Sequence, residues 1–198
     1  ADTSSSPGMG MTKFLPTSLP GVVIVEPAVF GDDRGWFMES YNQRRFVDGL
    51  ASLGLPAPRP FVQDNESHSR AGVLRGLHYQ LPPHPQGKLV RVVHGAVWDV
   101  AVDIRRHSPH FGRWVGVELT AENRRQLWIP EGYAHGFVAL SDDTRFLYKT
   151  TDVYARDCER AIAWNDATLA IAWPLPCGPL LAPKDAAAPA FAQADVFD

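Results

Sequence analysis

Alternation of apolar and polar residues with a period of two dominates the middle of the chain. The alternating segments are short, rich in valine, threonine and aromatic residues, and separated by glycine, proline or aspartate; they cover 21–26, 34–41, 72–80, 88–104, 112–120, 125–130, 135–140 and 144–152. Short strands at this spacing predict an all-β antiparallel sandwich or barrel. Residues 42–54 instead place Phe46, Leu50 and Leu53 on one helical face and stop at Gly54.

The same alternation predicts which polar groups share a strand face. In "GVLRGLHYQ", His78 is expected on the face opposite Arg75, and in "VWDVAVDI" Asp99 is expected opposite Trp98. Tyr148 lies on a further strand. We therefore expect the interior to collect His78, Asp99 and Tyr148 from different strands.

Length and composition predict one domain. The 198 residues are 45% hydrophobic, which is enough for a single well-filled core over residues 11–198. Residues 1–10, "ADTSSSPGMG", are small, polar and patternless, and we interpret them as a cloning remnant or a disordered tail.

Charge and cysteine content narrow the range of partners. The net charge is −3 and the basic residues are scattered, so neither nucleic acid nor a membrane surface is an expected partner. No segment is apolar for long enough to suggest a transmembrane helix. The two cysteines, Cys158 and Cys177, are too few for a disulfide scaffold, which favours free thiols and a cytoplasmic location.

Several cationic side chains lie among apolar neighbours, which points to an anionic ligand. His78, Arg75 and Lys88 would be costly to bury together without a counter-anion. A carboxylate would orient the His78 imidazole, and Asp99 and Asp185 are both candidates for that role.

A metal site is not expected. Barrels that bind a metal through a His-x-His pair need a second imidazole two residues after the first, and Gln80 stands there in this chain. Lys88 is a cation that cannot ligate a divalent ion, and His135 is solitary. We expect neither a metal nor another cofactor.

Eight segments, taken together, resemble one enzyme family. They are "DDRGWFMESY", "FVQDNESHS", "GVLRGLHYQ", "QGKLVRVVHGAVWDVAVDIR", "SPHFGRW", "LWIPEGYAHGF", "FLYKTTDVYARDCERAIAWND" and "LLAPKD". In order and density they are similar to the dTDP-4-dehydrorhamnose 3,5-epimerases of dTDP-L-rhamnose biosynthesis, from about residue 14 to residue 185. Ala182 departs from the family, which commonly has serine there.

The resemblance implies a fold and an assembly. The fold is a cupin-type jelly-roll β-sandwich or barrel with a few short peripheral helices. The assembly is a homodimer that exchanges N-terminal strands.

The resemblance also implies roles for individual residues. His78 would be the catalytic base, Asp185 its paired carboxylate, Lys88 a contact to the sugar O4, and Tyr148 the acid on the opposite ring face. Contacts to the sugar, the phosphates and the nucleotide would come from Arg75, Asn65, His135, Gln63, Asp64, Glu159 and Lys184, and across the dimer from Arg34 and Glu39.

This chemistry suits those residue types. A 4-keto sugar has acidic C–H bonds at C3 and C5; imidazole can remove such a proton, and an ammonium can stabilise the enolate. The predicted reaction converts dTDP-4-dehydro-6-deoxy-D-glucose to dTDP-4-dehydro-L-rhamnose. Three alternatives stay open: a mono-epimerase acting at C3 or C5 only, a metal-dependent cupin oxygenase or isomerase, and a binding module without activity.

Overall fold

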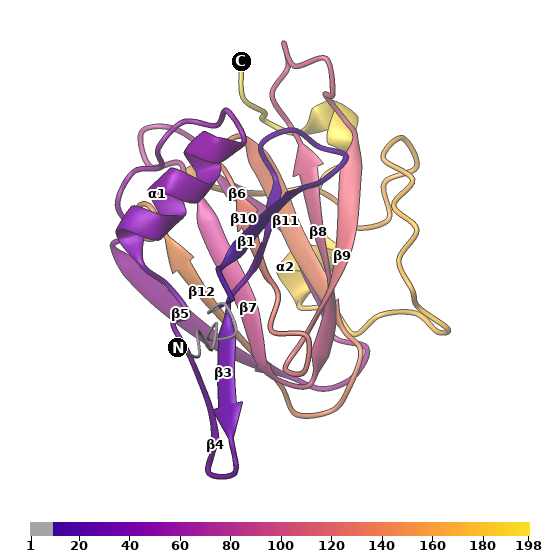
Figure 1. Ribbon diagram of the computed structural model, residues 1–198. Helices are drawn as coiled ribbons and strands as arrows, with labels where there is room; N and C mark the ends of the chain where they lie inside the picture. The colour runs from indigo at the N-terminus through magenta and orange to yellow at the C-terminus, as the bar shows by residue number, and fades with distance from the viewer. Residues whose placement is uncertain (1–9) are drawn as a thin grey trace, which may run out of the picture.

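Two antiparallel sheets pack face to face in the computed structural model, which describes residues 10–198 (Figure 1). One sheet has six strands, in the order β1 (Lys13–Pro16), β2 (Val23–Glu26), β10 (Gln126–Ile129), β7 (Lys88–His94), β12 (Thr144–Thr150) and β5 (Gln63–Ser69). The other has five, in the order β13 (Glu159–Ala161), β6 (Leu74–Gln80), β11 (Tyr133–Ala139), β8 (Ala96–Asp103) and β9 (Trp114–Thr120). The predicted all-β sandwich is confirmed; the sheets do not close into a barrel.

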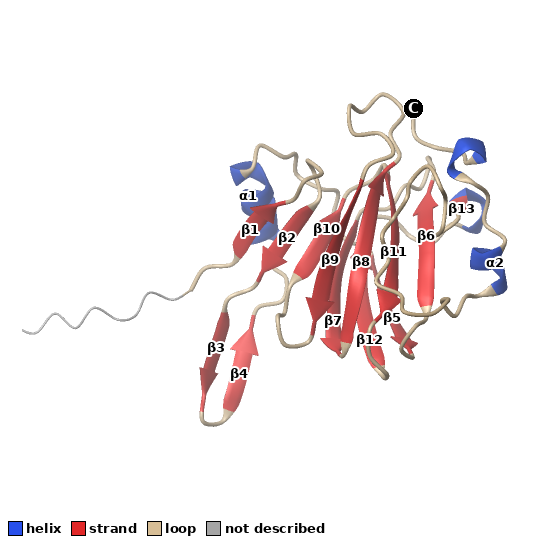
Figure 2. Ribbon diagram, turned by 90° about the vertical axis from the view of Figure 1, so that its right-hand side faces the viewer, coloured by secondary structure: helices blue, strands red, loops and turns tan. Residues whose placement is uncertain are grey.

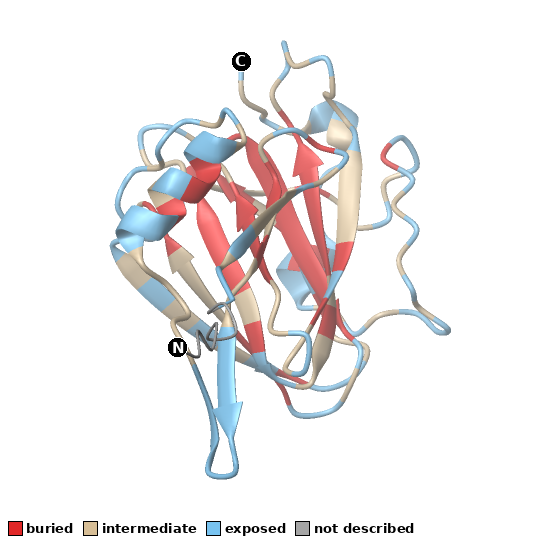
Figure 3. Ribbon diagram, in the orientation of Figure 1, coloured by how far each residue is buried: buried red, intermediate tan, exposed pale blue. Residues whose placement is uncertain are grey.

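The main core lies between the two sheets, and Figure 3 shows the buried strands that face it. Leu127 and Phe146 from the six-stranded sheet meet Leu119 and Phe137 from the five-stranded sheet, and all four are buried. Burying an aliphatic or phenyl side chain of this size contributes roughly 1.5–3 kcal/mol. This core fixes how strands of one sheet are placed against strands of the other.

The outer face of each sheet carries its own cover. Helix α1 (Gln43–Ser52) packs Phe46 and Leu50 over the six-stranded sheet, and its first turn is capped by Asn42 Oδ1, which accepts from the Arg45 amide at 3.1 Å. The helix predicted over 42–54 is confirmed. The five-stranded sheet is covered by the C-terminal segment through Trp173, Phe191 and Phe197.

The remaining helical pieces are short: η1 (Arg156–Cys158), α2 (Pro183–Ala186) and η2 (Phe191–Gln193). Cys158 is buried, Cys177 is exposed, and both are free thiols, as expected. Within residues 10–198, no helix is long and apolar enough to cross a bilayer. The interpretation of residues 1–10 concerns residues outside the described part, apart from Gly10.

A two-stranded hairpin projects away from the sandwich (Figure 2). It consists of β3 (Val29–Asp32) and β4 (Gly35–Met38), and it pairs with neither sheet. Phe30, Trp36 and Phe37 on it are 43%, 58% and 69% exposed. Large aromatic side chains on a projecting hairpin are typical of a surface that contacts another molecule.

A bulge in β6 changes the side-chain directions predicted for that strand. Against β11, His78 lies opposite His135 and Arg75 lies opposite Phe137, so Gly136 faces two residues of β6 rather than one. His135 and Phe137 are two residues apart and share a face, so Arg75 and His78 share it too. The prediction that they lie on opposite faces is wrong. In β8 the alternation holds: Trp98, Val100 and Val102 pack outward while Ala101 packs inward.

Gly76 makes the bulge possible, and its replacement should be costly. A Cβ on Gly76 would lie 2.6 Å from Gly136 Cα and 2.9 Å from the His135 carbonyl oxygen, at a φ of +134°. Gly72 also has a positive φ but meets nothing within 4 Å. We expect Gly72→Ala to lose about 1–2 kcal/mol of unfolding free energy from backbone strain, and Gly76→Ala to lose about 1–3 kcal/mol more from the clash. Urea titration measures both; equal losses would contradict this account of the bulge.

Candidate active site

His78, which is half-buried on the inner side of β6, pairs with the buried Asp185. His78 Nε2 lies 2.5 Å from Asp185 Oδ1, and Asp185 is 3% exposed. Asp185 comes from α2, whose first residue follows Ala182 without a side-chain cap. The Asp185 Oδ2 atom also accepts from the Gly76 amide at 3.5 Å, so the bulge and the carboxylate hold each other. Of the two candidate partners for His78, Asp99 and Asp185, it is Asp185 that forms the hydrogen bond in the structure.

Lys88 and Tyr148 approach from the facing six-stranded sheet. Lys88 Nζ lies 5.9 Å from the centre of the Tyr148 ring. Burial lowers the pKa of Lys88 to about 8, although the Asp99 and Glu159 carboxylates act in the opposite direction. Burial also raises the pKa of the Tyr148 phenol, so it holds its proton at neutral pH. An ammonium and a phenol thus face the imidazole across the sandwich.

Asp99 pairs with His135 rather than with His78. The two residues lie on neighbouring strands β8 and β11, and His135 Nε2 is 2.7 Å from Asp99 Oδ1. Asp99 is fully buried, and its Oδ2 has no hydrogen-bond partner among residues 10–198. Burial raises the pKa of Asp99 and lowers that of His135, while each group opposes the shift of the other. Both residues were candidates from the sequence, but their pairing with each other was not predicted.

Polar groups at the rim surround the four central side chains. Glu159 accepts from Lys184 at 2.8 Å and from the Tyr154 hydroxyl at 2.6 Å. Burial acts to raise its pKa, but these hydrogen bonds and the nearby cationic groups together lower it. Asn65 lies opposite Tyr148 in the β5–β12 pair and accepts from Gln63 Nε2 at 3.1 Å.

Arg75 belongs to the same rim. It donates to Ser69 Oγ and to the His68 carbonyl, both at 3.1 Å. Its charge acts on the Tyr148 phenol and opposes the rise of that pKa. The bulge therefore places a guanidinium beside the phenol, where strict alternation would have turned it away.

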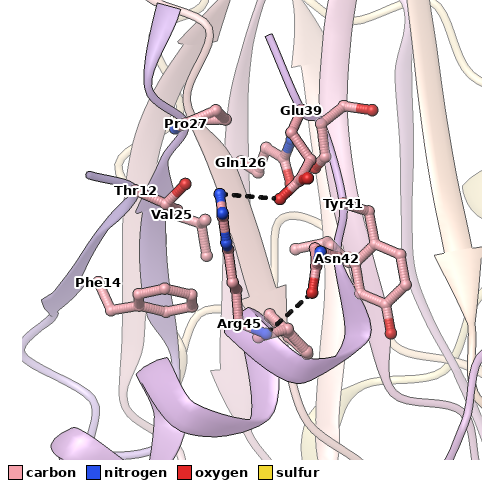
Figure 4. A pocket seen from close by; sticks show the side chains of 12 residues that line it. Thr12, Phe14, Val25, Pro27, Glu39, Tyr41, Asn42, Arg45 and Gln126 are labelled. Atoms are coloured by element: carbon pink, nitrogen blue, oxygen red, sulfur yellow. Dashed lines mark hydrogen bonds and ion pairs between the residues drawn. The ribbon is translucent and has the colours of Figure 1, made fainter. Parts of the chain in front are cut away.

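Three predicted site residues lie elsewhere in the single chain. Asp64 is paired with Lys149 at 3.0 Å, and both lie on the outer face of the six-stranded sheet. Arg34 sits on the projecting hairpin and pairs with Asp32. Glu39 lines a small pocket beside α1, where it contacts Arg45 at 3.2 Å (Figure 4). The lining of that pocket includes none of the four central side chains.

Gln80, at the position that would complete a His-x-His pair, has a structural role. The Gln80 amide donates to the carbonyls of His84 and Val153 and accepts from the Ala155 amide, which ties two loops to β6. Among residues 10–198, no three His, Cys, Asp or Glu side chains are grouped so that they could hold one metal ion.

Comparison with known proteins places the chain among sugar-nucleotide isomerases. The family model for dTDP-4-dehydrorhamnose 3,5-epimerase matches residues 16–193. A protein of that name from Pseudomonas aeruginosa is 58% identical over 180 residues, which is 91% of this chain and 96% of that protein. Another from Shigella flexneri is 56% identical over 183 residues, covering 92% and 98%.

A solved structure agrees with the sequence comparison. It is the Legionella pneumophila dTDP-6-deoxy-D-glucose-3,5-epimerase in complex with dTDP-4-keto-L-rhamnose, with a TM-score of 0.86 and 49% identity, covering 93% of this chain and 95% of that one. The fold predicted from the resemblance, a cupin-type β-sandwich, is confirmed. With the match across residues 16–193 and these relatives, the chain belongs to the dTDP-4-dehydrorhamnose 3,5-epimerase family.

Proposed function

We propose that this protein inverts C3 and C5 of dTDP-4-dehydro-6-deoxy-D-glucose to give dTDP-4-dehydro-L-rhamnose, with no cofactor. The observation that carries the proposal is that His78 and Tyr148 come from strands of the two facing sheets, with Lys88 5.9 Å from the centre of the Tyr148 ring. Inversion needs a base and an acid on opposite faces of the sugar ring. The two sheets provide that separation, since the ring would lie between them.

His78 is the proposed base. The hydrogens at C3 and C5 are acidic because the carbanion formed on deprotonation delocalises into the C4 carbonyl. Asp185, 2.5 Å from Nε2, fixes the ring and stabilises the imidazolium after proton uptake, as in other His–Asp pairs. Nδ1 is then the nitrogen directed to the substrate.

Lys88 is the proposed stabiliser of the enolate. The negative charge that develops on O4 is best met by a fixed donor in a site from which water is largely excluded, and Lys88 is 8% exposed. Loss of one such donor typically lowers kcat by about 10²–10³-fold. Because the pKa of Lys88 is about 8, the ammonium form predominates at neutral pH and is lost as the pH rises through that value.

Tyr148 is the proposed acid. Its phenol holds a proton at neutral pH and delivers it to the enolate carbon on the ring face opposite His78. The proton taken by His78 and the proton given by Tyr148 each exchange with solvent between turnovers. Each inversion therefore brings one solvent hydrogen into the sugar.

The proposed nucleotide site is shared between two copies of the chain. We propose that Arg75, Asn65, Gln63, His135, Glu159 and Lys184 bind the sugar and phosphates within one chain. Arg34 and Glu39 lie on or beside the projecting hairpin, and we propose that they reach the site of a second copy through exchange of N-terminal strands. The exposed Phe30, Trp36 and Phe37 would be covered in that assembly. Asp64 stays a prediction, and a cytoplasmic location is supported by the two free cysteines.

The test is solvent exchange in deuterium oxide. Incubation with the 4-keto substrate, followed by proton NMR, should show loss of signal at both C3 and C5 and appearance of the L-rhamno product. Exchange and inversion at one carbon only would identify a mono-epimerase. Tight dTDP binding without exchange by folded protein would identify a binding module, and activity that chelator removes and one metal restores would identify a metal enzyme; each result overturns the proposal.

A further inference from the structure

A fully buried carboxylate in the sandwich has no role in the scheme above. Asp99 lies in the centre of the five-stranded sheet, directly opposite Phe137 of β11, and its side chain points between the sheets. Oδ1 is held by His135, while Oδ2 is buried without a partner among the described residues. A buried carboxylate oxygen left without a donor costs several kcal/mol unless a nearby cation compensates it.

The cation that faces Asp99 is itself unpaired. Lys88 is buried in β7, and among residues 10–198 its ammonium has no hydrogen bond or ion pair and lies 5.9 Å from the centre of the Tyr148 ring. Asp99 is the leading influence that opposes the loss of the Lys88 proton, and Lys88 in turn favours the Asp99 carboxylate. Asp99 on β8 and Lys88 on β7 are thus two buried groups of opposite charge, one from each of the two facing sheets, and each influences the charge of the other.

We propose that Asp99 is a positioning residue whose buried carboxylate keeps Lys88 in its ammonium form and holds His135 by a hydrogen bond at Nε2. The inference rests on the proposed function, because it assigns the charge state of Lys88 in the same site. A neutral His135 donates its Nε2 hydrogen to Asp99 and leaves Nδ1 for the ligand. The Asp99 carboxylate therefore sets both the protonation of Lys88 and the tautomer of His135, two groups that face the sugar.

Other titratable groups near Asp99 and Lys88 also influence the protonation of these two residues. His78 on β6 and Asp185 on α2 lie on the His135 side, Glu159 on β13 contributes a second anion near Lys88, and Tyr148 on β12 stays neutral. Glu159 is already bound to Lys184 and Tyr154, so it cannot replace Asp99 at full strength. The balance on Lys88 should therefore depend mainly on Asp99.

The experiment is a direct titration of Lys88 in wild type and in Asp99→Asn. With ¹³C-labelled lysine, the Cε signal of Lys88, assigned by its absence in Lys88→Met, reports the ammonium without reference to catalysis. Removing an anion next to an ammonium lowers its pKa, so the midpoint should fall by about one pH unit or more. The alkaline limb of kcat/KM for epimerisation should move to lower pH by the same amount.

A matched control separates charge from fold. Asp103 lies on the same strand and the same face as Asp99 and is also fully buried. It accepts hydrogen bonds from Arg105 and Ser108, which lie outside the site. Asp103→Asn should leave the Lys88 midpoint in place even where it lowers stability. An unchanged midpoint in Asp99→Asn, or an equal shift in both variants, overturns the inference.

A second measurement covers the case in which Asp99→Asn fails to fold. In wild-type protein, the Asp99 carboxyl ¹³C signal should show an inflection at the Lys88 midpoint, because coupled groups report each other. The inference is also overturned if the Asp99 carboxyl is already protonated at pH 7, or if its signal does not change at the Lys88 midpoint. If no sugar exchanges protons at all, the proposed function fails while these titrations still decide the role of Asp99.

Discussion

The His78→Asn variant should lose solvent-deuterium incorporation at both C3 and C5 by about 10³-fold or more while keeping its fold. Asparagine fills similar space and can still hydrogen-bond to Asp185, but it cannot take up a proton near neutral pH. The measurement is the initial rate of exchange in deuterium oxide by proton NMR, alongside circular dichroism and dTDP binding.

His94→Asn is the matched control for this variant. His94 lies at the exposed end of β7 and hydrogen-bonds the Asp143 carbonyl, outside the site. It should exchange at the wild-type rate. Exchange above a tenth of the wild-type rate in His78→Asn would remove His78 as the base for that carbon.

Tyr148→Phe should separate proton removal from inversion. The phenyl ring of the variant still packs against Phe146 and still lies beneath the Lys88 ammonium, so only the hydroxyl is lost. His78 can still remove a proton and return a solvent deuteron to the same face. We therefore expect exchange with retained configuration, and a fall in formation of the L-rhamno product of about 10²–10⁴-fold.

The comparison for this variant is Tyr41→Phe, since Tyr41 packs on Phe46 and Phe61 in the cluster beneath α1. It should leave both rates unchanged. Product configuration and deuterium content are read from the same NMR spectra. Undiminished product formation in Tyr148→Phe would assign the acid to another group, and loss of all exchange would show that the phenol is also needed for proton removal.

Much of the fold follows from local patterns in the sequence. Period-two alternation identified the strands and placed Asp99 inward and Trp98 outward, because β8 runs without interruption. The spacing of Phe46, Leu50 and Leu53, with Gly54 as the stop, predicted α1 for the same reason. These features depend on neighbours close in the chain.

The parts that failed depend on partners far along the chain. Arg75 was placed on the wrong face because the glycine in the middle of β6 marks a bulge, and alternation assumes none. Gly76 was the available signal. The pairing of Asp99 with His135 follows from the β8–β11 register, which no local pattern records. Arg34 and Glu39 were expected to contact the nucleotide across a dimer, and that expectation stays a prediction.

The pairing of His78 with Asp185 has a consequence for the order of folding. The two residues are 107 positions apart, and α2 enters only after all strands of both sheets have been synthesised. Contacts of such long range form late and slowly. A nascent chain can thus assemble its sheets before α2 is available, so the imidazole of the proposed base gains its carboxylate partner only once residue 185 has been synthesised.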